Sequence, residues 1–475
     1  MSGRAKKIFR GMIWSGIDRF AMQGVQFILG LYLARLLDPQ DYGTLSILLV
    51  FIIFSTLFVE GGFSNALIQK EDRNRDDVST TFSFNIGVAL MLYTVLFFSS
   101  PAIASSLDTP ELSLYLRVLA LGMIINSIYL VPNVLLKIDL NFRLLAKINF
   151  ISTTISGVIA IWMAYGGYGI WALIVQNISR NLINLLLYAV LTKWDFSFKF
   201  SVDSFKKLYK YGVNLLVSSL LSNLVSQASS LIIMKFYSTA SLGLFTRGRQ
   251  FTDFFSATID SIINKVMLPG LSDLQNDREE LRNKFMRVFG LTSFLAVPIF
   301  LGLCSVAEPL ILALLKEKWE ASILIVQIFC FARLLHIYCA LLLNVIYITG
   351  ETHLLLKIQP WIILVRVLSL AATIPFGIYW IAVGEVIATA IHLMLYSQIF
   401  GKLIRFQMLD LIKHVAKYWL GGGLILGGVF TIISIPENQI VASIIGILTG
   451  IVVYVLYSFM ILRGDIGYIR KLIKI

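Results

Sequence analysis

Residues 440–462 read IVASIIGILTGIVVYVLYSFMIL, a stretch without a single charged side chain. A helix of about 20 apolar residues is long enough to cross the hydrocarbon core of a bilayer. Comparable stretches recur along all 475 residues, of which 57% are hydrophobic and 14% are charged. A soluble domain of this composition would lack the polar residues to cover its surface. The sequence therefore predicts an all-α integral membrane protein.

Walking outward from that stretch gives about fourteen predicted transmembrane helices. They lie near residues 11–37, 44–69, 80–104, 112–136, 148–166, 168–191, 208–236, 242–266, 286–307, 321–348, 354–375, 378–401, 415–434 and 440–462. The basic residues that precede the first span lack a small-residue cleavage site, so we expect that span to remain as an anchor.

The net charge of +13 is explained by where the basic residues lie. Lys and Arg concentrate in alternate loops, whereas the other loops contain only Lys316 and Lys318. This asymmetry is typical of the positive-inside rule and predicts that both termini are cytoplasmic. No basic module of the kind that reads nucleic acid is present. The three cysteines lack metal-ligand spacing, so we expect free thiols, no metal site and no cofactor.

A weak internal repeat appears when the sequence is shifted by 200 positions. Arg35, Gly43, Phe51, Phe54 and Glu60 then fall on Lys235, Gly243, Phe251, Phe254 and Asp260. A shift of 210 matches later positions, including Gly167 with Gly377. Because six spans separate the equivalents, the halves should share one orientation. The repeat predicts an N-terminal lobe at 1–200, a C-terminal lobe at 201–405 and an extra helix pair at 406–475, with a cleft between the lobes.

Ionisable side chains inside the spans are the candidates for function, because each costs roughly 2.5–3.5 kcal/mol to insert. The basic residues that are candidates for binding the substrate are Arg19, Arg35, Lys235, Arg247, Arg249 and Arg333. The acidic candidates, either ion-pair partners or proton carriers in a coupled cycle, are Glu60, Asp253, Asp260 and Glu385. Lys and Arg outnumber Asp and Glu within the spans, which favours an anionic substrate.

Polar stripes mark the first and seventh spans. Arg19, Gln23 and Gln26 recur at i, i+4 and i+7, which places them on one helical face. Asn223 and Ser226 repeat this pattern in the seventh span. Two interpretations stay open for the uncharged members: they line a cavity, or they form hydrogen bonds between helices.

The run LARLLDPQDYG at 33–43 resembles the multidrug/oligosaccharidyl-lipid/polysaccharide (MOP) flippase superfamily. Within it, the chain is most similar to Wzx-type polysaccharide and O-antigen exporters, particularly the colanic-acid exporter branch. Further matching pieces are LNFR at 140–143, SLGLF at 241–245, MLPGLS at 267–272 and KW at 318–319. The likeness covers essentially the whole chain.

That resemblance implies a two-lobed bacterial inner-membrane protein of fourteen helices. It would move an undecaprenyl-pyrophosphate-linked oligosaccharide from the cytoplasmic to the outer leaflet by alternating access, in lipopolysaccharide or polysaccharide biosynthesis. Cationic cavity residues would attract the pyrophosphate. The implied partners are this lipid-linked oligosaccharide, membrane lipids, and a glycan polymerase with export machinery.

Two other functions stay open at this point. One is a cation-coupled multidrug antiporter of the same superfamily. The other is a membrane glycan polymerase or ligase, which is disfavoured because the sequence shows no metal-ligand cluster, nucleophile elbow or sugar-nucleotide motif. We expect a transporter and not an enzyme.

Overall fold

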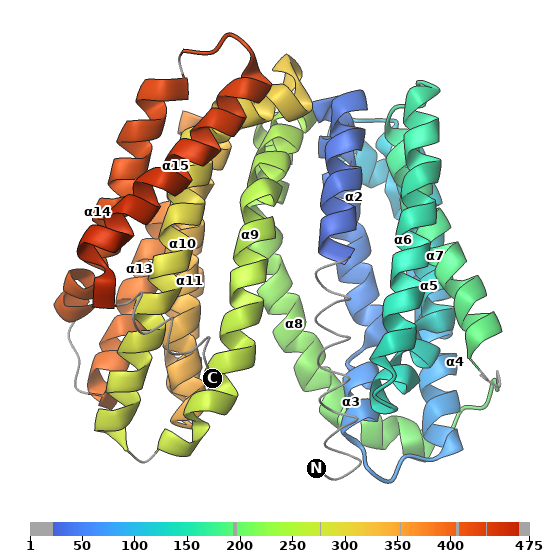
Figure 1. Ribbon diagram of the computed structural model, residues 1–475. Helices are drawn as coiled ribbons and strands as arrows, with labels where there is room; N and C mark the ends of the chain where they lie inside the picture. Colours follow the sequence, from blue (N-terminus) through green and yellow to red (C-terminus); the bar gives the residue numbers. More distant parts are fainter. Residues whose placement is uncertain are drawn as a thin grey trace. The chain divides into compact units, whose positions relative to one another are not determined.

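The computed structural model describes residues 22–192, 197–275, 277–351, 353–404, 408–433 and 435–464, and these contain helices but no strand. The first described helix covers residues 22–36. The chain then forms α2 (Pro39–Glu60), α3 (Phe63–Gln69), α4 (Arg75–Ser106), α5 (Leu112–Ile138), α6 (Phe142–Tyr165), α7 (Ile170–Leu191), α8 (Val202–Phe236), α9 (Thr239–Leu271), η1 (Ser272–Leu274), α10 (Arg278–Leu315), η2 (Glu317–Ser322), α11 (Ile323–Ile348), α12 (His353–Thr373), η3 (Ile374–Phe376), α13 (Ile378–Ile404), α14 (Met408–Ile433) and α15 (Gln439–Ile461) (Figure 1).

The predicted all-α membrane architecture is confirmed. Twelve of the described helices are long and apolar enough to cross a membrane. α9 is not among the twelve; it carries Arg247, Arg249, Asp253 and Asp260 along its length. The count of fourteen spans stays a prediction, since residues 1–21 lie outside the described part of the chain.

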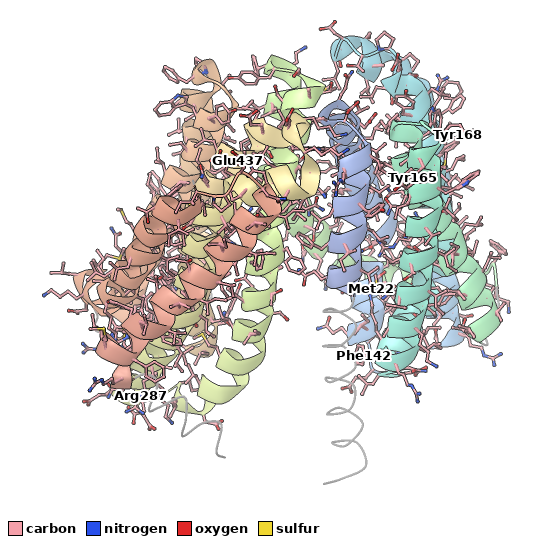
Figure 2. All side chains as sticks on the ribbon, turned by 45° about the horizontal axis from the view of Figure 1, so that its top comes forward. Met22, Phe142, Tyr165, Tyr168, Arg287 and Glu437 are labelled. Carbon is pink, nitrogen blue, oxygen red and sulfur yellow. The ribbon has the colours of Figure 1, made fainter. Side chains whose placement is uncertain are left out.

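Large apolar side chains cover the outside of the helices, as a protein solvated by lipid requires. Val190, Phe98 and Met460 are all at least 74% exposed. Aromatic side chains gather at the end of α6, where Tyr165 and Tyr168 are exposed and lie at the opposite end of the helix from Phe142 (Figure 2). Tyrosine at a helix end is typical of the membrane–water interface.

One predicted span is wrong in detail. The stretch 44–69 is not one helix but two, because the chain breaks between α2 and α3 at Gly61 and Gly62. Both glycines have positive φ, 52° and 73°, a conformation that residues with a Cβ rarely adopt. A Cβ on Gly62 would also overlap the backbone of Gly212 in α8. The break therefore allows a close helix contact.

The chain forms two compact units, Met1–Gly243 and Leu244–Ile475. In the first unit α5 packs against α2, α4 and α7, while α8 packs against α2, α3 and α4. In the second unit α10 packs against α11, α14 and α15, and α13 packs against α11 and α12. The predicted lobe boundaries at residues 200 and 405 stay predictions.

The internal repeat has local counterparts in the backbone. Gly167 and Gly377, equivalent at a shift of 210, both have positive φ at the turn between two helices. Within the first unit, Gly43 and Gly243 are each the fifth residue of their helices, α2 and α9. A Cβ on Gly43 would overlap the carbonyl oxygen of Thr239, and a Cβ on Gly243 would overlap that of Pro39. Thr239 and Pro39 are themselves equivalent at a shift of 200, so the contact is reciprocal.

Candidate functional site

The polar stripe of the first span is only partly described. Arg19 lies outside the described residues. Gln23 is half-buried and Gln26 is exposed, while Arg35 is exposed near the end of the helix that covers residues 22–36. These positions leave the predicted role of the stripe open.

The stripe of α8 uses hydrogen-bond partners in its own helix. The amide Nδ2 of Asn223 donates to the carbonyl oxygen of Ser219 at 2.9 Å. The hydroxyl of Ser226 donates to the carbonyl oxygen of Asn223 at 3.1 Å. Both side chains are half-buried. Bonds of this kind satisfy the donors without tying α8 to a neighbouring helix.

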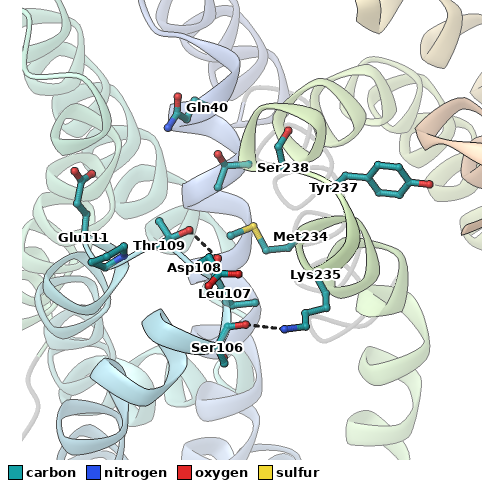
Figure 3. A pocket seen from close by; sticks show the side chains of 12 residues that line it. Gln40, Ser106, Leu107, Asp108, Thr109, Glu111, Met234, Lys235, Tyr237 and Ser238 are labelled. Atoms are coloured by element: carbon teal, nitrogen blue, oxygen red, sulfur yellow. Dashed lines mark hydrogen bonds between the residues drawn. The ribbon is translucent and has the colours of Figure 1, made fainter. Parts of the chain in front are cut away.

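Lys235 lies in a polar cavity of about 500 Å³ at one end of the first unit. Its ammonium donates a 2.8 Å hydrogen bond to the carbonyl oxygen of Ser106 at the end of α4 (Figure 3). A cation at this point stabilises the negative end of the helix dipole. The cavity is lined by the α4–α5 turn, the α8–α9 turn and Gln40 of α2. These loops, predicted to share one side of the membrane, do meet at one end of the unit.

Three charged candidates meet in the second unit, where α9 packs near α11. Asp253 accepts from Arg333 with an Nη2–Oδ1 distance of 2.5 Å, and its Oδ2 lies 3.4 Å from Nε of Arg249. Arg249 and Asp253 are one turn apart on α9, whereas Arg333 comes from α11. The guanidinium of Arg333 also lies over the Phe329 ring, 5.5 Å from its centroid. Asp253 thus bridges two arginines.

The second unit contains two further pairs of charged or ionisable side chains. Asp260 is seven residues, or about two turns, after Asp253 on α9. Its carboxylate lies 3.8 Å from Nδ1 of His336 and accepts a hydrogen bond from the Ser256 hydroxyl at 3.3 Å. Between α12 and α13, Nη2 of Arg366 donates to both carboxylate oxygens of Glu385 at 2.9 Å. In these described contacts, three arginines and one histidine meet three carboxylates. This cluster therefore contains as many carboxylates as arginines, and the excess of basic residues expected over all the spans stays a prediction.

Arg247 and Glu60, two further charged candidates, have neighbours other than these ion pairs. Arg247 is 5% exposed and donates to Oε1 of Gln250 at 2.6 Å. Glu60, half-buried at the end of α2, interacts with the charge of Lys137. No ion pair with an arginine is seen for Glu60 within the described part of the chain. Its alternatives, ion-pair partner or proton carrier, stay open.

The first unit also contains a network of uncharged polar side chains that was not predicted from the sequence. The Tyr129 hydroxyl of α5 donates to Oδ1 of Asn181 at 2.7 Å and accepts from Asn126 at 2.8 Å. Asn133 donates to the Tyr188 hydroxyl at 2.6 Å, and the two tyrosine rings stack. Asparagines at 177, 181 and 184, spaced i, i+4 and i+7 on α7, are the signal that could have revealed it.

Asp77 was also missed. It is fully buried near the start of α4 and forms a 2.5 Å ion pair with Lys70. It also accepts from the backbone N–H of Asn74 at 3.0 Å, while Asn74 caps the helix in return. The reciprocal pattern is a capping box, recognisable from Asn74 and Asp77 at a spacing of three.

A family model described as polysaccharide biosynthesis protein matches residues 32–324. The succinoglycan biosynthesis transport protein ExoT of Rhizobium meliloti is 25% identical over 374 residues, which are 78% of this chain and 75% of the relative. The teichuronic acid biosynthesis protein TuaB of Bacillus subtilis is 24% identical, over 79% of this chain and 78% of the relative. The lipopolysaccharide biosynthesis protein WzxC of Escherichia coli is 25% identical, over 70% and 68%.

Solved structures show the same fold. The lipid II flippase MurJ in an inward closed conformation aligns with a TM-score of 0.74 at 17% identity, over 96% of this chain and 100% of that one. An inward-facing multidrug MATE transporter of the MOP superfamily aligns with a TM-score of 0.54 at 14% identity, over 84% and 99%. The multidrug antiporter alternative is not favoured, because the sequence relatives named above are polysaccharide biosynthesis proteins. The predicted resemblance to Wzx-type polysaccharide exporters is confirmed by WzxC, the fold is that of a solved MOP transporter, and the chain belongs to the polysaccharide biosynthesis protein family.

Proposed function

We propose that this chain is a flippase that moves an undecaprenyl-pyrophosphate-linked oligosaccharide from the cytoplasmic to the outer leaflet of the bacterial inner membrane. The observation that carries the proposal is that a polysaccharide biosynthesis family match falls on a chain whose described part contains twelve helices long and apolar enough to cross a membrane. A glycan is too polar to cross hydrocarbon unaided. A protein embedded in the membrane can supply that step without making or breaking a covalent bond.

The relatives support a substrate class and not one sugar. Their names specify succinoglycan, teichuronic acid and lipopolysaccharide, which are different glycans. What such substrates can share is the lipid carrier with its phosphates. Arginine suits that shared part, because its planar guanidinium offers paired donors to phosphate oxygens. Arg249 and Arg333 are the best-placed described candidates, and Arg19 remains a candidate from the sequence.

Alternating access is the mechanism that the internal repeat supports. Repeat-related halves in transporters rock against each other around a site near the bilayer midplane. The proposed orientation has both termini in the cytoplasm. Reporter tags inserted at residues 75, 200 and 405 should all be cytoplasmic, and a tag found outside would contradict this topology.

The direct test is deletion of the gene in its native host. We expect loss of the surface glycan and accumulation of lipid-linked oligosaccharide that an externally added glycosidase cannot reach in spheroplasts. Restoring the gene on a plasmid is the control. Normal surface glycan together with a collapse of drug tolerance would reject the flippase in favour of a multidrug antiporter.

A further inference from the structure

The first turns of α8 carry three lysines on one exposed face. Lys206, Lys207 and Lys210 are all exposed. Lys206 and Lys207 lie four and three residues before Lys210, a spacing that places the three side chains on one side of a helix. None of them forms an ion pair with a residue in the described part of the chain. Asp203 is the only acidic residue from 197 to 210, so this face has a net positive charge.

Large aromatic side chains are exposed beside these lysines. Phe198 and Phe200, just ahead of the helix, are 73% and 53% exposed, and Lys199 between them is exposed as well. Tyr209, next to Lys210, is 47% exposed. Basic residues interleaved with exposed aromatic rings are typical of segments that lie in the headgroup region of a bilayer. The rings enter the interface while the ammonium groups stay near the lipid phosphates.

The position of these residues along α8 agrees with that depth. The part of α8 that is long and apolar enough to cross a membrane is Gly212–Phe236. Lys206 and Lys210 precede Gly212 by six and two residues. At 1.5 Å per residue this places them about 3–9 Å before the start of the span. The headgroup layer on each side of the hydrocarbon core is roughly 5–7 Å thick. The lysines therefore fall at the level of the lipid phosphates.

The opposite face of the segment is fixed to the first unit. Leu208 is 2% exposed and packs with Phe63 and Ala66 of α3. Just before the helix, the backbone N–H of Ser201 donates to the Thr80 hydroxyl of α4 at 2.9 Å. The start of α8 and α3 lie at the same end of the unit (Figure 1). These contacts determine which face of the segment is turned outward.

We propose that the outward face of residues 198–210 is a binding surface for anionic phospholipid headgroups of the adjacent leaflet. We call it the lysine face, and it consists of Phe198, Lys199, Phe200, Lys206, Lys207, Tyr209 and Lys210. This inference goes beyond the proposed function, because it concerns the bilayer and not the transported glycan. An acidic protein would suit the lysines, but the bilayer also accounts for the exposed rings and for the depth of the segment.

Photo-cross-linking maps the proposed contact directly. The full-length protein is placed in nanodiscs of one part phosphatidylglycerol to two parts phosphatidylcholine, with a photoreactive group on the headgroup of either lipid. A lysine near an anionic membrane surface contributes about a 5-fold preference for anionic lipid. Cross-links to residues 198–210 should therefore be at least about 5-fold more abundant from phosphatidylglycerol than from phosphatidylcholine. In about 1 M salt, where the Debye length is roughly 3 Å, this excess should disappear.

Substitution of the three helical lysines tests their part in the excess. In the triple variant Lys206→Gln, Lys207→Gln and Lys210→Gln, the excess should fall below about 2-fold. The corresponding triple arginine variant keeps the charges and should keep the excess. An undiminished excess in the glutamine variant would contradict the assignment of these lysines.

The turn between α5 and α6 supplies the matched control. Lys137, Arg143 and Lys147 are exposed and are predicted to lie on the same side of the membrane, with one acidic residue, Asp139, among them. Replacing these three basic residues by glutamine changes the net charge by the same amount. The excess at residues 198–210 should remain as in the wild type. An equal loss in both glutamine variants would show a general charge effect and overturn the inference.

Thermal stability gives a second readout. A ligand that binds the folded protein raises its melting temperature. Exchanging phosphatidylcholine for phosphatidylglycerol should therefore raise the melting temperature of the wild type and of the control variant more than that of the Lys206, Lys207 and Lys210 glutamine variant. The wild-type cross-linking tests the surface even if that variant does not fold. Equal cross-linking from both lipids would overturn the proposal and favour an acidic protein as the partner.

Discussion

The two units connect their helices through different kinds of polar interaction. The first unit joins α5 and α7 through neutral groups, the Tyr129 and Tyr188 hydroxyls with asparagine amides. The second unit joins α9 to α11 and α12 to α13 through arginine–carboxylate pairs. Neutral networks satisfy donors and acceptors at little electrostatic cost, whereas ion pairs bring full charges into a medium that disfavours them.

The backbone repeat and the polar side chains of the two units are therefore independent of each other. Repeat-equivalent glycines make reciprocal close contacts in α2 and α9, yet Leu49 and Ile53 of α2 stand where α9 has Arg249 and Asp253. The shared positions are those that the packing requires. Arg249 and Asp253 are charges of α9 that the equivalent helix lacks, whereas Asp260 has an acidic equivalent in Glu60.

The largest expected effect comes from breaking an ion pair in the second unit. Glu385→Gln leaves Arg366 without its carboxylate, which should lower the free energy of unfolding by about 3–5 kcal/mol. Replacing both residues by leucine should recover most of that loss. The measurement is equilibrium unfolding in mixed micelles. A double variant as unstable as the single one would show that the pair is not an isolated unit.

A smaller loss of stability is expected when the close glycine contacts that the two halves share are disturbed. Gly43→Ala should cost about 1–3 kcal/mol, because the new methyl group overlaps the backbone of Thr239. Gly243→Ala should cost the same, since its contact with Pro39 is the reciprocal one. Gly24→Ala, where a Cβ would meet no neighbouring atom within 4 Å, is the control and should not destabilise the protein. If the two substitutions lowered the free energy of unfolding by different amounts, the two contacts would not be equivalent.

The smallest effect is expected in the neutral network of the first unit. Tyr129→Phe removes one hydroxyl shared by several asparagines, so the free energy of unfolding should fall by only about 0.6–1.7 kcal/mol. Glycan export should be unchanged. If Tyr129→Phe lowered the free energy of unfolding as much as Glu385→Gln, the proposed difference between the two units would be wrong.

Sequence reasoning predicted the helices well because apolar length is a local property. It missed the break at Gly61 and Gly62, which depends on the approach of Gly212 from a distant helix. It selected Arg249, Asp253 and Arg333 as separate candidates but could not bring them together, since helical periodicity relates Arg249 only to Asp253 on the same helix. Lys235 was chosen for its charge alone; its bond to the carbonyl of Ser106 depends on tertiary structure.

We assign the charges of Arg249, Asp253 and Arg333 to export and not to the fold. The triple variant Arg249→Leu, Asp253→Ile and Arg333→Met gives α9 the residues of α2 at the two equivalent positions and removes the third charge. Surface glycan is measured in the deletion strain carrying this variant, with Glu280→Gln plus Lys284→Gln as the paired-charge control. We predict wild-type protein levels for both and a loss of export of at least about 10-fold for the triple variant alone. Normal export by the triple variant would contradict the account.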